Sequence, residues 1–420
     1  HICLMADLTN ISIHDNYEHF TEVLNLTKGV DFSNSRKGIS NEEYAIYYYP
    51  QALIKTNSNL PFFVASPKLF ALMNDSGKDL KKELKEIGGK RVQVRKIPMN
   101  GKEIEVVKLG DIADVKVGLQ TGDNNAYLFQ NPEARGNYRS IRDYEEFLLT
   151  DEDLEKIRNN DSLRLSVIDK GISKDDVKSE RYFGGRYIIP YDKGGESDAE
   201  GGWMPNYFVP TNYFIDWSEW AIRRMKSLTT AERNKLEGKE GGNNKLCSRF
   251  QNSESYFTKA IDCSRVGIYS PTYRIATDTV YDSGCNDIYV MINSRENNLG
   301  ILASRFWRFQ FISFINHTVN SQTDDNDDVI FVLKSNEKLI INNVNFIIQN
   351  QKSNPRYDYA SHEQIEIDKL VYEAYGLNAE DVQEVEHWYA RRYPKLSAAQ
   401  KANLRALGKS DNYLELYGLK

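Results

Sequence analysis

Leu109-Gly-Asp-Ile-Ala-Asp-Val-Lys-Val-Gly-Leu-Gln-Thr-Gly-Asp-Asn124 is a strand-like run that ends in a polar glycine turn. The apolar positions that predict a buried run are Ile112, Val115, Val117 and Leu119. The residues Thr121-Gly-Asp-Asn124 predict a tight turn, in which Gly122 can adopt a positive φ. Such a turn can bring backbone N–H groups close to a ligand oxygen or a phosphate. Any hairpin can use it, so its meaning depends on the segments that follow.

The chain has 420 residues, of which 54 are basic and 60 acidic, and a formal net charge of −6. This length predicts roughly two to four structural units and enough material for a sizeable core. Mild acidity argues against binding polyanions through bulk charge. The charge is segregated, however, because residues 78–96 are mainly basic and residues 324–328 are mainly acidic. The distribution of charge is therefore a better guide to partners than its total.

The sequence has no run of about 18 apolar residues, so we expect no membrane span and no membrane partner. The chain begins His1-Ile-Cys-Leu-Met5, without an initiator methionine or a cleavable signal pattern, which predicts a fragment of a longer protein. The four cysteines, Cys3, Cys247, Cys263 and Cys285, are scattered and form no C-x-x-C motif. We expect buried free thiols in a cytoplasmic protein, without a zinc site or disulfide framework.

The pattern of short elements predicts an α+β fold in three segments. Residues 1–104 are mixed, with a short helix at 67–73 and a basic helix at 78–86 that ends at Gly88-Gly89. Residues 336–420 are helical. Residues 105–335 hold short β-like runs separated by Gly, Asn, Asp and Pro, for example at 186–189, 207–209, 266–269 and 287–291.

Two helices are expected inside the β-rich middle segment. The first, 216–228, opens with Asp216-Trp-Ser-Glu219, which has the spacing of a capping box. The second, 299–315, carries apolar side chains at helical spacing. Arg305 and Arg308 are interleaved with these side chains, and we expect both to be solvated.

Capping residues divide the helical tail. Asn378-Ala-Glu-Asp381 predicts the start of a helix that Pro394 ends. Ser397-Ala-Ala-Gln400 has capping-box spacing for a further helix, and Gly408 is a plausible stop.

The chain shows no convincing catalytic constellation. Its six histidines have no zinc-ligand spacing, and no P-loop, G-x-G-x-x-G or G-x-S-x-G motif occurs. Glu366-Ile-Asp368-Lys369 contains the residue types of a metal-dependent nuclease, but its place in an amphipathic helix favours a solvated face. We therefore expect no enzymatic activity, metal or cofactor in this chain.

Basic side chains alternate with aromatic ones in the middle segment. Arg, Lys, Asn and Gln read base edges, and Tyr, Ser and Thr commonly reach phosphates. The basic side chains are Lys116, Arg181, Arg186, Lys193, Arg223, Arg224, Arg249, Lys259, Arg265 and Arg274. Aromatics in small β domains are mostly core, so the interleaving alone supports DNA binding only weakly. Arg223 and Arg224 also close a helix, where cations suit the helix dipole.

Several segments in a fixed order resemble the target-recognition and C-terminal region of adenine DNA methyltransferases. The stretch 109–124 resembles the opening of that region, and Arg186-Tyr-Ile-Ile-Pro-Tyr-Asp-Lys-Gly-Gly195 is similar to its aromatic step before Lys-Gly-Gly. The other similar segments are 212–217, 249–261, 265–275, 299–305, 316–322 and 367–377. Type IIG restriction–methylation enzymes, TaqI-like specificity domains and BREX phage-defence methyltransferases share this pattern. His317 and the acidic loop 324–328 depart from it.

The resemblance implies that residues 105–335 form a β-rich target-recognition domain for double-stranded DNA. Residues 1–104 would be a connector or the end of a methyltransferase domain, and residues 336–420 a helical appendix. The upstream domain of the parent chain would bind S-adenosylmethionine and methylate an adenine flipped out of the duplex. The implied phosphate or groove contacts are Thr121, Gly122, Asp123, Asn124, Lys193, Gly194 and Gly195. Further DNA-binding candidates are Lys116, Arg223, Arg224, Arg249, Lys259 and Arg274.

Two other functions stay open. A cryptic nuclease would cleave plasmid DNA in the presence of a divalent metal. A protein-interaction module of a defence complex would bind a partner tightly without salt-sensitive affinity for DNA. The sequence does not settle whether the parent protein cleaves DNA or only methylates it.

Overall fold

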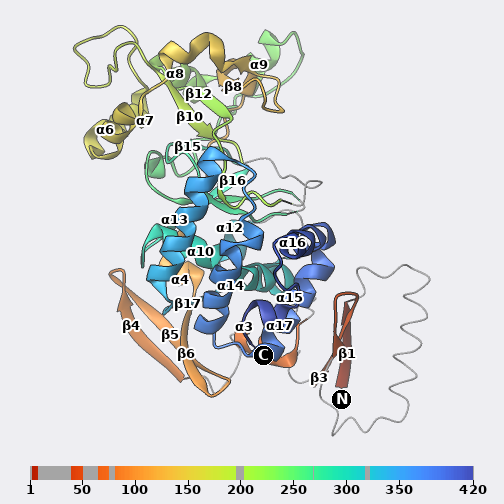
Figure 1. The fold of residues 1–420 in the computed structure, drawn as a ribbon. Coiled ribbons are helices and arrows are strands. Elements are labelled where there is room, and N and C mark those ends of the chain that lie inside the picture. Colours follow the sequence, from red (N-terminus) through yellow and green to blue (C-terminus); the bar gives the residue numbers. More distant parts are fainter. Residues whose placement is uncertain are drawn as a thin grey trace. The chain divides into compact units, whose positions relative to one another are not determined.

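The computed structural model describes residues 2–7, 39–50, 65–74, 81–194, 203–267, 269–316 and 322–419. The chain divides into two compact units. We call His1–Ala113, Ser197–Tyr207 and Val290–Lys420 the flanking unit, and Asp114–Glu196 with Phe208–Tyr289 the inserted unit. Figure 1 labels their elements. The α+β fold class is confirmed.

The flanking unit contains a four-stranded sheet that joins distant parts of the sequence. Its antiparallel strands follow the order β17 (Ile330–Val332), β6 (Lys102–Lys108), β5 (Lys90–Met99) and β4 (Lys81–Ile87). The compact units do not follow the boundaries at 104/105 and 335/336, because residues 105–113 and 290–335 of the predicted middle segment belong to the flanking unit. The functions assigned to those three segments stay predictions.

The prediction of a basic helix at 78–86 is wrong, because Lys81–Ile87 is a strand that pairs with β5 along its whole length. Gly88 and Gly89 have φ of +57° and +78°, so the glycine pair turns the chain into a hairpin. In β5, Val92 and Val94 are buried while Gln93 is exposed, which is the period of a strand. Pairing of this kind outweighs the local helix propensity of lysine and glutamate.

A second sheet of the flanking unit has the order β1 (Ile2–Asp7), β3 (Ala45–Pro50) and β2 (Ile39–Ser40). The short helix predicted at 67–73 is confirmed as α3 (Pro67–Met73). The Ser66 hydroxyl accepts a hydrogen bond from the Leu69 N–H, and Pro67 occupies the first turn. Both features are favourable at a helix start.

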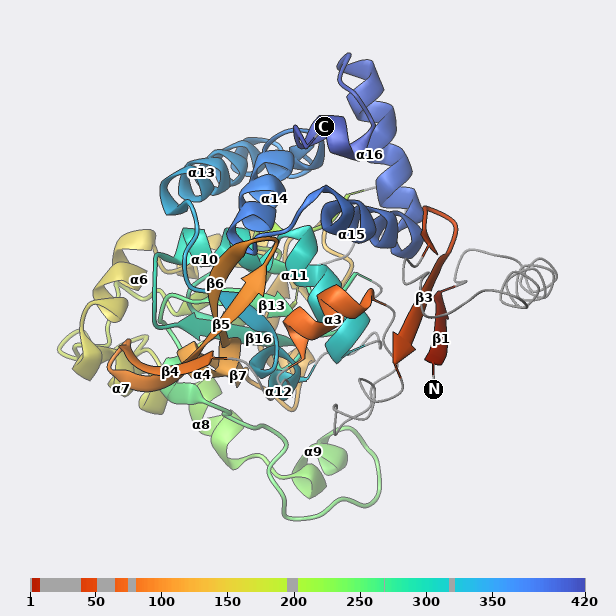
Figure 2. The same cartoon turned by 90° about the horizontal axis from the view of Figure 1, so that it is seen from below.

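The helical part of the flanking unit follows the sequence with two corrections (Figure 2). The helix expected at 299–315 is split into α10 (Arg295–Leu302), α11 (Arg305–Gln310) and a π-helical turn at Phe311–Ile315. The split arises because the Ser304 hydroxyl caps α11. Later helices are α12 (Thr323–Asp327), α13 (Glu337–Ser353), α14 (Glu363–Ala374), α15 (Ala379–Arg392), α16 (Pro394–Ala406) and α17 (Tyr413–Leu416), with a 3₁₀ turn at Tyr359–Ser361.

Asn378 caps α15 in a capping box with Asp381, as expected. α15 ends two residues before Pro394, close to the predicted position. Pro394 is also the first residue of the next helix, α16, for which the sequence predicts a later start. Ser397 is therefore inside α16 and does not cap a new helix. Gly408 has φ of +67° just beyond α16, which fits the predicted stop.

The inserted unit is built on two five-stranded sheets. One has the order β15 (Val280–Tyr281), β10 (Ile188–Asp192), β12 (Tyr213–Asp216), β8 (Leu128–Gln130) and β9 (Arg139–Ser140). The other has the order β11 (Tyr207–Phe208), β14 (Tyr273–Ile275), β13 (Ile261–Ser264), β16 (Cys285–Val290) and β7 (Ala113–Val117). The opening stretch begins as a helical turn, α4 (Leu109–Ile112), so its strand starts later than predicted.

Five helices accompany these sheets: α5 (Asn124–Tyr127), α6 (Asp151–Arg158), α7 (Asp161–Lys170), α8 (Glu219–Ser227) and α9 (Thr230–Leu236). Short 3₁₀ turns lie at Ile141–Phe147 and Ser253–Ser255. The helix expected at 216–228 is α8, but Ser218 caps it, because Asp216 belongs to β12. Of the strand expected at 266–269, residue 268 lies outside the described residues, and Val266 forms only an isolated bridge in the connection that Ser264 and Thr272 close between β13 and β14.

The core of the inserted unit surrounds Trp217, whose indole N–H donates to the Val167 carbonyl at 3.1 Å. Ile222 and Met225 of α8 pack into this core. Cys247, Cys263 and Cys285 are buried free thiols, as expected. Among the described residues, no helix is both long enough and apolar enough to cross a membrane.

Candidate nucleic-acid interface

All thirteen residues predicted to bind DNA belong to the inserted unit. Gly195 lies outside the described residues, and the other twelve can be placed. They fall into two groups and two isolated positions. One group surrounds the turn that ends the opening stretch, and the other surrounds Lys193.

The turn Thr121–Asn124 uses its side chains to hold its own shape. The Thr121 hydroxyl donates to Asn124 Oδ1 at 2.5 Å, and Asp123 Oδ1 accepts the Ala126 N–H at 3.1 Å as the cap of α5. Gly122 has φ of +79°, and a Cβ there would lie 2.5 Å from the carbonyl carbon of Cys247. Glycine is therefore required both by the backbone conformation and by the close approach of a second segment.

Two further segments meet this turn. The Arg233 guanidinium on α9 donates to the Gly122 carbonyl at 3.0 Å. Gln120 and Arg249 exchange backbone hydrogen bonds of 3.0 and 2.8 Å. Burial raises the pKa of Tyr127 to about 12, and the charge of Arg224 on α8 opposes this shift. The turn, α8, α9 and residues 247–249 thus converge.

We define the turn–α8 surface by Gly122, Trp220, Arg223, Arg224, Arg233 and Arg249. Arg223 and Arg249 are exposed, and neither side chain forms an ion pair with any residue that the structure describes. Arg224 is half-buried, with its guanidinium 5.8 Å from the centre of the Trp220 ring. Trp220 itself is 50% exposed. The sequence did not predict Arg233 and Trp220, although the capping box at Thr229 and Glu232 indicates the helix that carries Arg233.

Two members of the second group lie at a small, solvent-open pocket of the inserted unit. Lys193 and Arg274 both line it. The Lys193 amine lies 5.3 Å from the centre of the Tyr138 ring. The Gly194 N–H donates to Asp192 Oδ1 at 2.9 Å.

Arg274 is not an exposed phosphate contact, contrary to the interpretation from the sequence. Its side chain is 1% exposed, and its Nη2 lies 2.7 and 2.6 Å from the two carboxylate oxygens of Asp192. The pair is buried because Asp192 and Arg274 lie on interior strands β10 and β14. Burial, the largest single influence, disfavours ionisation of Asp192, but the charge of Arg274 together with hydrogen bonds from Arg274, Asp262 and the Gly194 N–H lowers the pKa of that carboxyl.

Two more carboxyls surround this ion pair. Asp262 on β13 lies opposite Arg274 on β14 and opposite Asp287 on β16 in the strand register. Burial, together with the neighbouring carboxyls, raises the pKa of Asp262 and of Asp287 well above the ordinary value. Arg274 thus interacts with Asp192 and Asp262, and Asp262 in turn faces Asp287, a cluster that no local pattern in the sequence indicates.

Lys116 and Lys259 belong to neither group. Lys116 Nζ pairs with Glu254 Oε1 at 3.0 Å. Lys259 is exposed, and its charge is one of the causes that lower the pKa of Glu155, after the hydrogen bond and charge of Arg158.

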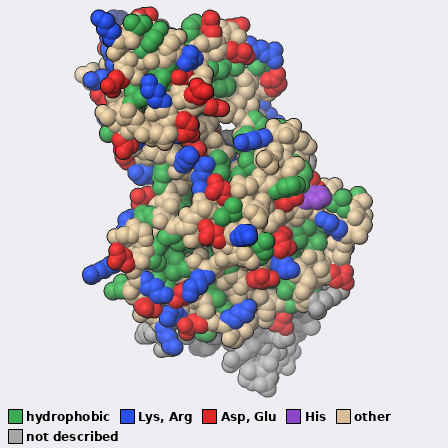
Figure 3. All heavy atoms as spheres, turned by 60° about the vertical axis from the view of Figure 1, so that its left-hand side comes forward, with side chains coloured by type: hydrophobic (Ala, Val, Ile, Leu, Met, Phe, Trp, Pro, Cys, Tyr) green, Lys and Arg blue, Asp and Glu red, His purple; other side chains and the backbone are tan. Residues whose placement is uncertain are grey.

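The basic segment 78–96 of the flanking unit is less cationic than its composition suggests. Lys85 Nζ lies 2.5 Å from Glu105 Oε1, and Lys96 Nζ lies 3.1 Å from Glu83 Oε2. On the face drawn in Figure 3, basic and acidic side chains are likewise interspersed in the described part. Acidic side chains therefore offset much of the basic charge in this segment and on this face.

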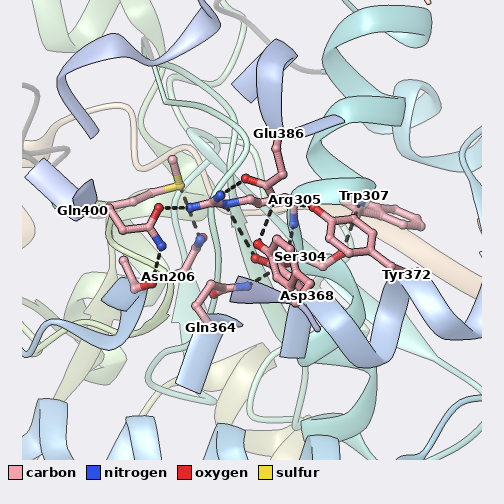
Figure 4. Close-up of polar contacts among 12 residues, drawn as sticks. Asn206, Ser304, Arg305, Trp307, Gln364, Asp368, Tyr372, Glu386 and Gln400 are labelled. Atoms are coloured by element: carbon pink, nitrogen blue, oxygen red, sulfur yellow. Dashed lines mark hydrogen bonds and ion pairs between the residues drawn. The ribbon is translucent and has the colours of Figure 1, made fainter. Parts of the chain in front are cut away.

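A buried polar network lies in the flanking unit and corrects two sequence interpretations (Figure 4). Arg305 and Arg308 are 5% and 3% exposed and are not solvated. The Arg305 guanidinium donates to Glu386 and Gln400, and its Nε lies 3.6 Å from Asp368 Oδ2. These partners come from α15, α16 and α14, so only the tertiary fold brings them together.

Asp368 is fully buried, so the solvated face expected for Glu366-Ile-Asp368-Lys369 is wrong for this residue. Its Oδ1 accepts the Arg305 backbone N–H at 2.8 Å. Burial raises the pKa of Asp368 to about 7, and Arg305 limits the shift. Glu366 is exposed, so the two carboxyls face different surroundings. Within the described ranges, no group of three or more His, Cys, Asp or Glu side chains is placed to hold a metal ion.

No protein-family model matches this chain, and no curated protein matches it. Among solved structures, the chain is similar to the type IIL restriction-modification enzyme MmeI, determined in complex with DNA, with 12% sequence identity and a TM-score of 0.31. The match covers 94% of this chain and 50% of that chain, so this chain spans half the length of that enzyme. A TM-score this low carries no argument about function.

Proposed function

We propose that the inserted unit binds duplex DNA through the turn–α8 surface. The observation that carries the proposal is the convergence of three separate sequence segments on this surface, with Arg223 and Arg249 exposed and unpaired within the described part of the chain. Each unpaired cation can neutralise a phosphate and release its counterions. The order of motifs along the sequence supports the same function.

In its finer form, the proposal makes this chain the DNA-specificity part of a restriction–modification or phage-defence adenine methyltransferase. A methyltransferase domain earlier in a longer chain would bind S-adenosylmethionine and carry out the reaction. The residues of the inserted unit would hold the duplex and select the site. This form rests on the resemblance of the motifs.

Fluorescence anisotropy of the chain with a random-sequence duplex, across a salt series, tests the proposal. We expect log Kd to change linearly with log salt concentration, with a slope of about 0.9 per phosphate contacted. The variant Arg223→Ala/Arg249→Ala should reduce that slope by about 1.8 and weaken binding to all sequences alike.

A variant that removes two other positive charges is the matched control. Arg142 pairs with Glu133 at 3.1 Å, and Arg405 pairs with Asp411 at 3.2 Å. Arg142→Ala/Arg405→Ala has the same net charge as the test variant and should keep the wild-type slope. Equal slopes for all three proteins would contradict the turn–α8 surface, and absence of salt-dependent binding would contradict DNA binding itself.

A further inference from the structure

The exposed face of α8 has a pattern of its own. Trp220, Arg223, Arg224 and Ser227 recur at the i, i+3, i+4 and i+7 positions that share one side of a helix, and all are exposed or half-buried. Ala221, Ile222 and Met225, on the opposite side, are buried in the core of the inserted unit. The outer side therefore carries one aromatic ring and two guanidinium groups.

Ion pairs near both ends hold α8 in place. At its first turn, Glu219 pairs with Arg181 at 2.7 Å, and at its last turn Lys226 Nζ lies 3.0 Å from Asp169 Oδ1. Ser218 caps the N-terminus by accepting the Ala221 N–H. Figure 1 shows α8 as a regular helix that precedes α9. A helix fixed in this way presents its outer side chains from an ordered backbone, so binding costs little backbone entropy there.

The side chains of Arg223 and Arg224 on this face differ in how firmly their positions are held. Arg223 is exposed and has no ionic partner within the described residues. Arg224 lies over the Trp220 ring, and that ring is 6.3 Å from the ring of buried Tyr127. A guanidinium whose position is set by packing is suited to directional recognition, whereas an unrestrained one suits phosphate contact.

We propose that α8 enters the major groove of DNA and that Arg224 reads a guanine there, while Arg223 contacts a phosphate. This inference rests on the proposed DNA-binding function. The nine residues of α8 span about 14 Å, and the groove admits an α-helix. Arginine donates two parallel hydrogen bonds to guanine O6 and N7 from a rigid planar fork, whereas the lysine ammonium is a flexible point charge that holds this geometry less well. Trp220 orients Arg224 and therefore acts as a positioning residue.

Selection of bound duplexes from a random pool tests the assignment with the variants Arg224→Lys and Arg223→Lys. Both keep the positive charge, so bulk electrostatics are matched. We expect Arg224→Lys to lower the preference for guanine at one position by roughly 5- to 150-fold. Arg223→Lys should leave the selected sequence unchanged. Far-UV circular dichroism checks that both variants fold.

A second variant, Trp220→Leu, separates positioning from bulk packing. It should weaken the guanine preference at the same position as Arg224→Lys and leave the salt dependence unchanged. An Arg224→Lys protein that selects the wild-type sequence would overturn the inference, and so would a wild-type protein that binds without sequence preference. A wild-type protein that shows no affinity for duplex DNA would instead contradict the proposed function, and the inference with it.

Discussion

Replacement of Asp262 by asparagine should make the inserted unit more stable relative to the wild type as the pH rises. Asp192, Asp262 and Asp287 are buried together, and the cation Arg274 interacts with Asp192 and Asp262. The ion pair with Arg274 lowers the pKa of Asp192, whereas burial raises the pKa of Asp262 and Asp287 well above the ordinary value. The folded protein therefore keeps protons on Asp262 and Asp287 at a pH where the unfolded chain releases them.

The sign follows from proton linkage. Above an unfolded pKa of about 3.9, each retained proton lowers the free energy of unfolding by about 1.4 kcal/mol per pH unit, until the pH reaches the folded pKa. This contribution to stability is thus complete at low pH and is lost as the pH rises. In Asp262→Asn the amide cannot ionise, so the slope of stability against pH should become shallower by about 1.4 kcal/mol per unit. The amide can donate to the neighbouring Asp192 carboxylate, as the protonated Asp262 carboxyl does, so any cost of the substitution itself is the same at every pH.

Amide hydrogen exchange of the peptide that contains Ile261–Ser264 measures this stability between pH 5 and 8, after correction for the intrinsic exchange rates. The exposed Asp143→Asn is the matched control and should retain the wild-type slope. Parallel pH profiles for Asp262→Asn and the wild type would refute the reasoning, because they would mean that Asp262 is ionised in the folded protein.

Three further predictions concern stability. Gly122→Ala should destabilise the inserted unit by more than about 1 kcal/mol, because φ is +79° and the new Cβ would meet Cys247 at 2.5 Å. Hydrogen exchange around residue 122 should become faster, and unchanged exchange would contradict the close contact. Arg305→Ala should lower the free energy of unfolding by about 3–5 kcal/mol, because it leaves the Glu386 carboxylate buried without its cation. The urea concentration at the unfolding midpoint should fall, and an unchanged midpoint would contradict the buried network. Asn378→Ala should lower the free energy of unfolding by about 1 kcal/mol, because α15 loses its N-cap. Urea unfolding measures this change, and an unchanged midpoint would mean that the helix does not start at Asn378.

Local signals in the sequence predicted the elements whose geometry is set locally. Pro67 and Asn378 mark helix starts that the structure confirms, because a cap or an N-terminal proline acts within one turn. The basic strand at 81–87 was predicted as a helix, because its identity depends on pairing with β5 and on the Gly88-Gly89 turn. A strand that is exposed on both faces lacks the alternation that would indicate it.

The buried charges show the other limit of sequence reasoning. Arg305 finds Glu386 and Gln400 from helices that lie far along the chain, and Arg274 finds Asp192 on a strand of the other sheet. Arginine side chains without a partner are mostly exposed to solvent. The residues next to Arg305 and Arg274 in the sequence give no sign of a partner, so both side chains are expected to be exposed. Only the tertiary fold supplies the partners that make burial of a charge tolerable.

The candidate interface was predicted in part. Resemblance to known motifs selected the Thr121–Asn124 turn, and basic charge at a helix end selected Arg224; the structure brings both together with Arg249. The same reasoning could not separate exposed Arg223 from buried Arg274, because both are single cations among aromatics. Arg233 was missed because its contact with the Gly122 carbonyl depends on the place of α9 in the fold.

Hydrogen exchange of the whole chain, with and without a saturating random-sequence duplex, tests the central claim most directly. The account predicts slower exchange in peptides covering residues 119–127, 219–236 and 246–250, which contain the residues of the turn–α8 surface. Residues 81–99, the basic hairpin of the flanking unit, should exchange at the same rate in both samples. Protection confined to that hairpin, or no protection anywhere in the inserted unit, would contradict the assignment of DNA binding to the inserted unit.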